Sequence, residues 1–224
     1  MNRKNKTKIW RLIALLGLTA SCLFGLGLRL HAQEAVSILD KAEAAYEKAN
    51  GIKAAFTMRT RSDARQVTES FEGTIQMKGD KFVWQTPDMT TWFDGTTQWT
   101  YVPRNGEVNV SAPTGEELQF TNPALLLRSY KKGFDAVYKG ECTAPNGKSA
   151  YEIELTPKKK GDIRKAILQI EKFSSFPASI TVETKNGMLS TIQIDRVETG
   201  INQPDGFFVF KEADFPDAEI IDLR

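Results

Sequence analysis

The feature that most constrains this chain is its strand periodicity, which begins near residue 54 and continues over most of the remaining length. Apolar side chains recur there at every second position, as in Phe82 with Trp84 and Trp99 with Tyr101. The runs are separated by dipeptides that favour a positive φ and so a tight reversal. These are Asp94-Gly95, Asn105-Gly106, Asn146-Gly147, Asn186-Gly187 and Asp205-Gly206. About ten short strands at this spacing predict one antiparallel sheet that has to curl or close.

A helix is predicted before the first strand, over residues 34–50. Its apolar side chains follow the three- and four-residue spacing of an amphipathic helix. They are Ala35, Leu39, Ala42, Tyr46 and Ala49. Asn50-Gly51 then supplies the left-handed conformation in which many helices end.

A second, short helix interrupts the strands after residue 113. Thr114 to Glu117 resembles a capping box, and Asn122-Pro123 resembles an N-cap followed by proline at the first helical position. Leu125, Leu126 and Leu127 follow at once. A helix whose first turn is almost entirely apolar has to cover an apolar surface, most simply the concave face of the curled sheet.

The first 32 residues have the composition of a secretory signal peptide. Five basic residues precede an apolar stretch over 12–28, and Ala32 stands where a signal peptidase would cut. We expect cleavage there, with an uncleaved membrane anchor as the alternative, and a lipoprotein signal at Cys22 is disfavoured. Cleavage would leave 192 of the 224 residues, with 24 basic and 28 acidic side chains and a net charge of −4. Residues 33–224 are expected to form one domain.

The exported chain would be poor in reactive groups. His31 and Cys22 leave with the signal, so no histidine and only one cysteine, Cys142, remain. Catalytic triads and nearly all zinc sites need histidine or several cysteines. We therefore expect no catalytic residue, no metal, no cofactor and no enzyme activity, although a pair of catalytic carboxylates is not excluded by spacing. The acidic net charge disfavours nucleic acid as a partner.

One hairpin and the order of elements around it carry a family resemblance. Residues 93–103 read FDGTTQWTYVP, which resembles the D-G-x-x-x-W-x-Y-x-P hairpin of the periplasmic lipoprotein carrier (LolA-like) family. The preceding helix and the segments 54–57, 71–75 and 82–84 occur in the order found in that family. The end of the chain is similar to the family's closing F-x-F strand at residues 207–210 and to its V-x-D-like tail at 218–222.

The resemblance implies an unclosed β-barrel, with helices forming a lid over a hydrophobic cavity for the acyl chains of lipoproteins. It further implies a periplasmic carrier that takes its cargo from an inner-membrane ABC transporter and delivers it to an outer-membrane acceptor. Transfer of a lipid makes and breaks no bond, in keeping with the missing catalytic groups. We expect a monomer. The alternative is a periplasmic regulatory domain on the same fold that senses lipids or lipoproteins.

Twelve residues are predicted to line the cavity, from the strand faces, the hairpin and the short helix. They are Phe56, Met58, Phe71, Ile75, Met77, Phe82, Trp84, Trp99, Tyr101, Leu125, Leu126 and Leu127. The competing interpretation is that they fill a solid core, as apolar side chains at strand spacing usually do. One departure from the family concerns the lid. Where the best-known branch has an Arg-Pro pair whose arginine ties the lid shut, this chain has Lys78-Gly79.

Overall fold

A computed structural model describes residues 31–62, 67–114, 118 and 123–224. It contains one sheet of twelve strands in the order β12-β6-β5-β4-β3-β2-β1-β11-β10-β9-β8-β7. The first six strands along the chain are β1 (Ile52–Ser62), β2 (Val67–Lys78), β3 (Lys81–Gln85), β4 (Thr90–Phe93), β5 (Gln98–Val102) and β6 (Glu107–Ser111). The others are β7 (Phe134–Thr143), β8 (Ser149–Pro157), β9 (Ile163–Glu171), β10 (Pro177–Thr184), β11 (Met188–Thr199) and β12 (Glu219–Asp222).

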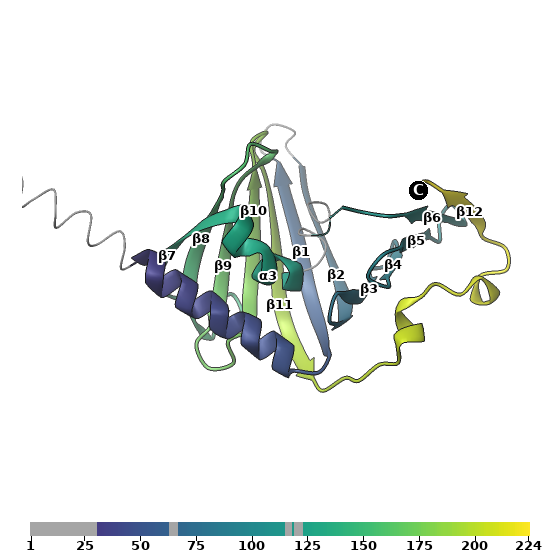
Figure 1. The fold of residues 1–224 in the computed structure, drawn as a ribbon. Helices are drawn as coiled ribbons and strands as arrows, with labels where there is room; N and C mark the ends of the chain where they lie inside the picture. Colours follow the sequence, from purple (N-terminus) through teal and green to yellow (C-terminus); the bar gives the residue numbers. More distant parts are fainter. Residues whose placement is uncertain (1–30, 63–66, 115–117, 119–122) are drawn as a thin grey trace, which may run out of the picture.

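The sheet curls without closing, as expected from the sequence and the resemblance. Its two edges are β7 and β12, which do not pair with each other, and β3 to β6 turn away from the part formed by β7 to β11 (Figure 1). Every pair of neighbours is antiparallel except β12 and β6, which run parallel. Four of the five predicted Gly turns form, with positive φ at Gly95, Gly106, Gly147 and Gly187. The fifth dipeptide, Asp205-Gly206, instead begins a short 3-10 helix, η1 (Asp205–Phe208).

The N-terminal helix occupies residues 31–48 within the described part of the chain and crosses one face of the sheet diagonally (Figure 1). It ends as predicted at Asn50 and Gly51, whose φ angles are 49° and 94°. A Cβ atom on Gly51 would lie 2.2 Å from the carbonyl oxygen of Ile201. Both the backbone angle and this close approach therefore require glycine at the corner between helix and sheet.

The short helix, α3 (Pro123–Gly133), lies on the same face of the sheet as the N-terminal helix. Leu126, Leu127 and Tyr130 of α3 are buried together with Leu39 of the N-terminal helix in the larger hydrophobic core. The sheet contributes the inward side chains of β8, β9 and β10 to this core. Two helices over one concave face therefore bury the apolar stripe that each presents.

The chain after β11 takes a different path from the one expected. The resemblance predicted a strand at residues 207–210, but residues 205–208 form η1, and a second 3-10 helix, η2 (Glu212–Asp214), follows. Phe208 and Phe210 are buried against the sheet instead of extending it, because the segment crosses the face of β3 to β6 before β12 joins the edge. The predicted tail at 218–222 does form a strand, which is β12.

Several sequence predictions lie outside the described residues. They are residues 1–30 of the signal peptide predicted over 1–32, residues 115–117 of the capping box and the Asn122 cap. Among the described residues, no helix is both long enough and apolar enough to cross a membrane.

Candidate functional site

An apolar cavity of about 40 Å³ lies between the concave face of the sheet and the helices. Its walls come from the N-terminal helix, α3 and the strands β1, β2, β10 and β11. The lining residues are Tyr46, Ile52, Ala54, Ile75, Met77, Leu127, Phe176, Pro177, Ile194 and Val197. Neither a charged side chain nor an amide side chain is among them. This lining can therefore surround a hydrocarbon chain, but it offers no charged partner to a polar ligand.

An aromatic cluster adjoins the cavity where β1, β2 and β3 pair. The Phe56 ring lies over Gly73 of the neighbouring strand, where a Cβ atom would come within 2.5 Å of the ring. The Trp84 ring meets Phe56 edge-on, with 5.0 Å between the ring centroids. Phe82 is fully buried beside Phe93, with centroids 5.3 Å apart. Gly73 thus leaves the space in which the aromatic side chains of three strands meet.

Trp84 also carries an unusual polar atom. Its indole Nε1 is buried and has no hydrogen-bond partner, and no other buried side-chain nitrogen or oxygen in the described residues lacks one. Buried donors are almost always paired, because an unsatisfied one costs about 1–3 kcal/mol. Among the described residues, the interior therefore contains one buried hydrogen-bond donor, the Trp84 N–H group, that has no acceptor in the protein.

The structure separates Trp99 and Tyr101 from the other predicted cavity residues. Directly paired residues share a face of the sheet, and Trp99 pairs with Trp92, whereas Phe82 pairs with Phe93. Trp92 and Phe93 are adjacent in β4 and point to opposite faces. Trp99 and Tyr101 accordingly pack on the outer face against the C-terminal segment.

That outer-face packing is aromatic and specific. The Tyr101 and Phe215 rings have centroids 4.6 Å apart, and Phe215 also stacks on Phe210 at 5.2 Å. The two residues taken from the hairpin motif therefore hold residues 207–218 against the sheet. They do not line the interior, and the cavity prediction does not hold for these two side chains. The period-two pattern groups residues within a strand but does not say which face each group occupies.

The remaining predicted residues whose side chains the structure describes lie on the interior side. Ile75, Met77 and Leu127 line the cavity, and Leu126 is buried in the adjoining core. Met58 and Phe71, which are opposite each other in β1 and β2, are half-buried at the margin of the aromatic cluster. The backbone of Leu125 belongs to α3, but its side chain lies outside the described part of the structure.

Several lining residues were not predicted. Ile52 and Ala54 share the β1 face with Phe56, so the same two-residue spacing could have identified them. Tyr46 was assigned to the apolar stripe of its helix but not to the cavity. Phe176 and Val197 carried no signal, because neither their motif nor their periodicity distinguishes them from other apolar residues.

The two helices are joined by a small polar cluster. The Tyr130 hydroxyl donates a hydrogen bond of 2.7 Å to Asp40, and Lys131 forms an ion pair of 2.7 Å with the same carboxylate. Partial burial raises the pKa of Asp40, but the hydrogen bonds from Lys131 and Tyr130 outweigh it and hold that pKa below its ordinary value. Burial and the Asp40 carboxylate raise the pKa of Tyr130, so the phenol remains a donor at neutral pH.

Lys78-Gly79 stands where the best-known branch of the family has Arg-Pro, and its described contacts are with the C-terminal segment and the N-terminal helix. The Lys78 ammonium donates a hydrogen bond of 2.9 Å to the carbonyl of Gln203 and lies 3.9 Å from Asp205, both in the C-terminal segment. The carbonyl of Gly79 accepts a hydrogen bond of 3.0 Å from the Tyr46 hydroxyl. The described polar contacts that hold α3 come from Asp40 of the N-terminal helix, whereas Lys78 at the end of β2 contacts the C-terminal segment.

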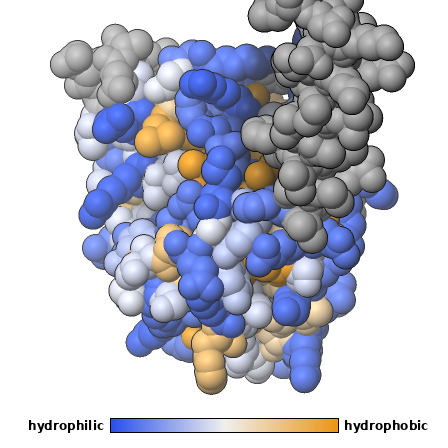
Figure 2. Space-filling view, turned by 90° about the vertical axis from the view of Figure 1, so that its left-hand side faces the viewer, coloured by the Kyte–Doolittle hydropathy of each residue, from blue (hydrophilic) through white to orange (hydrophobic). Residues whose placement is uncertain are grey.

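The surface and the thiol complete the description of the polar groups. The side of the molecule that carries β7 and the start of the N-terminal helix is mainly hydrophilic, with scattered apolar side chains (Figure 2). No group of three or more potential ligands is placed to hold a metal ion in the ranges that the structure covers.

Cys142 is half-buried beside Ala144, Ala150 and Ala178, and burial raises the pKa of its thiol.

Comparison with known proteins agrees with this architecture. Residues 27–187, more than half of the chain, match the family model described as "Outer membrane lipoprotein carrier protein LolA". This chain belongs to that family. The match includes the N-terminal helix, α3 and the strands β1 to β10. We find no curated protein whose sequence matches.

Solved structures with this fold are distant in sequence. An uncharacterized conserved protein from Thermus thermophilus superimposes with a TM-score of 0.57 at 14% identity, covering 84% of this chain and 99% of that one. A LolA superfamily protein from Nitrosomonas europaea gives 0.44 at 14%, with 79% and 97% covered. A putative outer membrane lipoprotein-sorting protein domain from Vibrio parahaemolyticus gives 0.45 at 10%, with 79% and 97% covered. At 14% identity, the likeness to the Thermus thermophilus protein shows a shared fold alone.

Proposed function

We propose that this LolA family protein is a periplasmic carrier that holds the acyl chains of lipoproteins beneath its two helices. The observation that carries the proposal is the cavity lined by apolar side chains, continuous with the Phe56–Trp84 cluster and covered by the N-terminal helix and α3. A carrier of this kind neither forms nor breaks a covalent bond. The signal-like residues 1–32 and the family's description support export and transfer from the inner to the outer membrane.

The size of the cavity indicates how loading has to occur. About 40 Å³ is far below the roughly 300–1,000 Å³ of ordinary ligand pockets. Binding of an acyl chain therefore requires α3 to move away from the sheet, so that the chain replaces the contacts of Leu127. A chain of about sixteen carbons gains on the order of 12 kcal/mol on leaving water, at about 0.8 kcal/mol per methylene. That gain is large enough to offset the loss of the contacts that two or three leucine-sized side chains make.

The unpartnered Trp84 Nε1 favours a ligand that carries an oxygen acceptor. Acyl chains of lipids and lipoproteins end in ester or amide carbonyls, and such a carbonyl would accept the indole hydrogen bond in the aromatic cluster beside the cavity. A pure hydrocarbon would leave the donor unsatisfied. By family resemblance, we propose that an inner-membrane ABC transporter supplies the cargo and that an outer-membrane acceptor removes it.

A pair of alanine substitutions tests the binding proposal. Ala54 lines the cavity, whereas Ala178 is equally buried among Ala144, Ala150 and Cys142. Ala54→Leu and Ala178→Leu both overpack a buried site, at a cost of about 1–3 kcal/mol. Titration with a fluorescent palmitic acid should show one site in the wild type and in Ala178→Leu, and weaker binding in Ala54→Leu. Equal affinity for all three proteins, or no binding at all, contradicts the proposal.

A further inference from the structure

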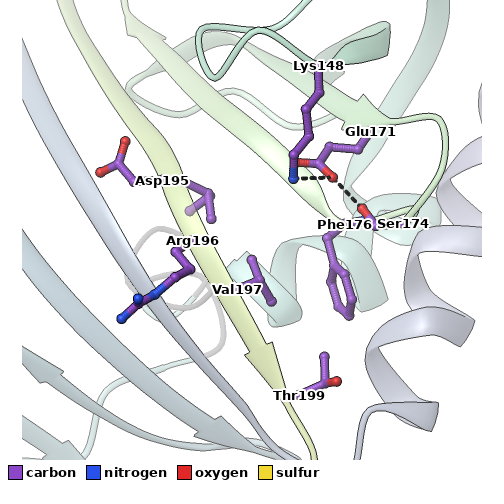
Figure 3. A pocket seen from close by; sticks show the side chains of 9 residues that line it. Lys148, Glu171, Ser174, Phe176, Asp195, Arg196, Val197 and Thr199 are labelled. Atoms are coloured by element: carbon purple, nitrogen blue, oxygen red, sulfur yellow. Dashed lines mark hydrogen bonds and ion pairs between the residues drawn. The ribbon is translucent and has the colours of Figure 1, made fainter.

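The sheet has a gap beside the second half of β11. β10 and β11 pair from Glu183 with Leu189 to Ser179 with Gln193, and there the pairing ends. β11 continues to Thr199 along β1, so residues 194–199 have no strand on their other side among the described elements. The turn between β9 and β10 lies opposite this free edge (Figure 3).

Two cavities meet at the gap from opposite sides of the sheet. Outside it lies a polar cavity of about 180 Å³, whose walls include Lys148, Glu171 and Ser174. On the inner side lies the apolar cavity described above. Phe176, Ile194 and Val197 line both, so these three apolar side chains stand between the polar cavity and the interior.

Of these three residues, Phe176 alone comes from the turn across the gap. Its carbonyl accepts a hydrogen bond of 2.9 Å from the Glu171 amide, and its own amide donates one of 3.2 Å to the Ser174 hydroxyl. Ser174 in turn donates a hydrogen bond of 2.6 Å to the Glu171 carboxylate, which also pairs with Lys148 at 2.9 Å. Because the backbone at residue 176 is held in this way, rotation of the phenyl ring is the smallest motion that would join the cavities.

The rim of the gap is also suited to an amphiphile. Phe173, in the same turn, is fully exposed at 102% of its reference area, which is unusual for an aromatic side chain. The Lys148 ammonium provides a charged hydrogen-bond donor at the outer cavity, whereas the Ser174 hydroxyl already donates to Glu171. The path therefore runs from polar groups at the surface, past one aromatic ring, to an apolar interior.

We propose that this gap is a second entrance to the interior, closed by the ring of Phe176, and that it admits one chain of a single-chain amphiphile while its polar head stays in the outer cavity. The proposal rests on the proposed function, since it assumes an interior that binds acyl chains. It differs from loading beneath α3 in its route, because the chain enters through the sheet and α3 moves only to make room for it in the interior. The width of one phenyl ring limits the entrance to one chain at a time.

Thiol labelling tests the entrance without any lipid. Ala54→Cys places a thiol in the inner cavity of the mature chain, with Cys142→Ser to remove the native thiol. Methyl methanethiosulfonate should label this protein slowly, and Phe176→Ala should raise the labelling rate by about tenfold. Phe210→Ala is the control, because Phe210 is a core residue on the outer face of β4 to β6 and its loss reports only the effect of lower stability. If Phe176→Ala destabilises the fold too far, Phe176→Leu takes its place.

A second measurement separates the two proposals. Stopped-flow mixing with fluorescent palmitic acid should show faster association and dissociation in Phe176→Ala than in wild type or Phe210→Ala. Labelling of Phe176→Ala no faster than Phe210→Ala overturns the entrance, whether or not palmitic acid binds. Faster labelling in a protein that binds no palmitic acid overturns the proposed function and, with it, the role of the gap in lipid entry.

Discussion

The Tyr130 hydroxyl of α3 donates a 2.7 Å hydrogen bond to the Asp40 carboxylate of the N-terminal helix. Tyr130 is 1% exposed, so this contact lies at the junction of the two helices that cover the sheet. A lid that opens beneath α3 has to break it. The contact therefore couples the position of α3 to the stability of the helix pair.

Removing that hydroxyl should loosen the lid. Tyr130→Phe keeps the ring in the core and deletes the hydrogen bond, which should lower the free energy of unfolding by about 1 kcal/mol. Dissociation of fluorescent palmitic acid should become faster at the same time. Glu47→Gln, which changes an exposed carboxylate on the N-terminal helix, serves as the control for both measurements. A Tyr130→Phe protein with unchanged dissociation would mean that α3 does not control release.

Leu126 and Leu127 should differ although they are neighbours in α3. Both are 3% exposed, but only Leu127 lines the cavity. Truncation to alanine should destabilise either variant by about 2–5 kcal/mol. Only Leu127→Ala should also change the affinity for palmitic acid, because it alters the cavity wall. Equal effects of the two substitutions on affinity would show that α3 is purely structural.

Trp84→Phe tests the unpartnered indole. The substitution removes a buried donor that has no acceptor in the protein, which should cost no stability, whereas the smaller ring should lower stability through lost packing against Phe56. Affinity for methyl palmitate should fall about fivefold, the equivalent of roughly 1 kcal/mol, while affinity for hexadecane should not. Trp99→Phe, on the outer face, should affect neither ligand. An equal loss of affinity for methyl palmitate and for hexadecane would show that the indole ring, and not its N–H group, contributes to binding.

Glu171 should make the turn at residues 172–176 sensitive to acid. Burial raises the pKa of its carboxyl, but hydrogen bonds from Ser174, Lys148 and Asn146 outweigh this and hold the pKa below its ordinary value of 4.5. The stabilisation is therefore fully present above pH 4.5 and is lost as the pH falls through the lower folded-state pKa. Urea unfolding across this range should show a smaller loss of stability in Glu171→Gln than in wild type. Parallel pH profiles for the two proteins would contradict the assignment.

Local patterns in the sequence were sufficient for most of the fold. The spacing of Leu39 and Tyr46 predicted the first helix, and Asn50-Gly51 its end, because helix amphipathicity and the left-handed cap are properties of neighbouring residues. Strands and hairpins followed from the period of two and from the glycine turns, as at Gly95. The F-x-F segment at 207–210 was not predictable in this way, since its path depends on packing over distant strands.

The site was less accessible to sequence reasoning. Ile75 and Met77 line the apolar cavity, but Trp99 lies on the outer face, because the face that a strand residue occupies depends on the register of β3, β4 and β5. Phe176 lies between the two cavities because the pairing of β10 with β11 ends at Ser179 and Gln193. Where that pairing ends depends on tertiary packing and not on neighbouring residues. Resemblance supplied the idea of an interior lined by apolar residues, whereas the structure identified which residues line it.

The most direct test of the central claim is transfer of a triacylated lipopeptide from vesicles to the mature protein. After incubation, gel filtration separates the protein from the vesicles, and mass spectrometry counts the lipopeptide in the protein fraction. We predict about one lipopeptide per protein, reduced in Ala54→Leu and retained in Ala178→Leu. A protein fraction free of lipopeptide, from vesicles shown to exchange it with an added lipid-binding protein, would contradict the account.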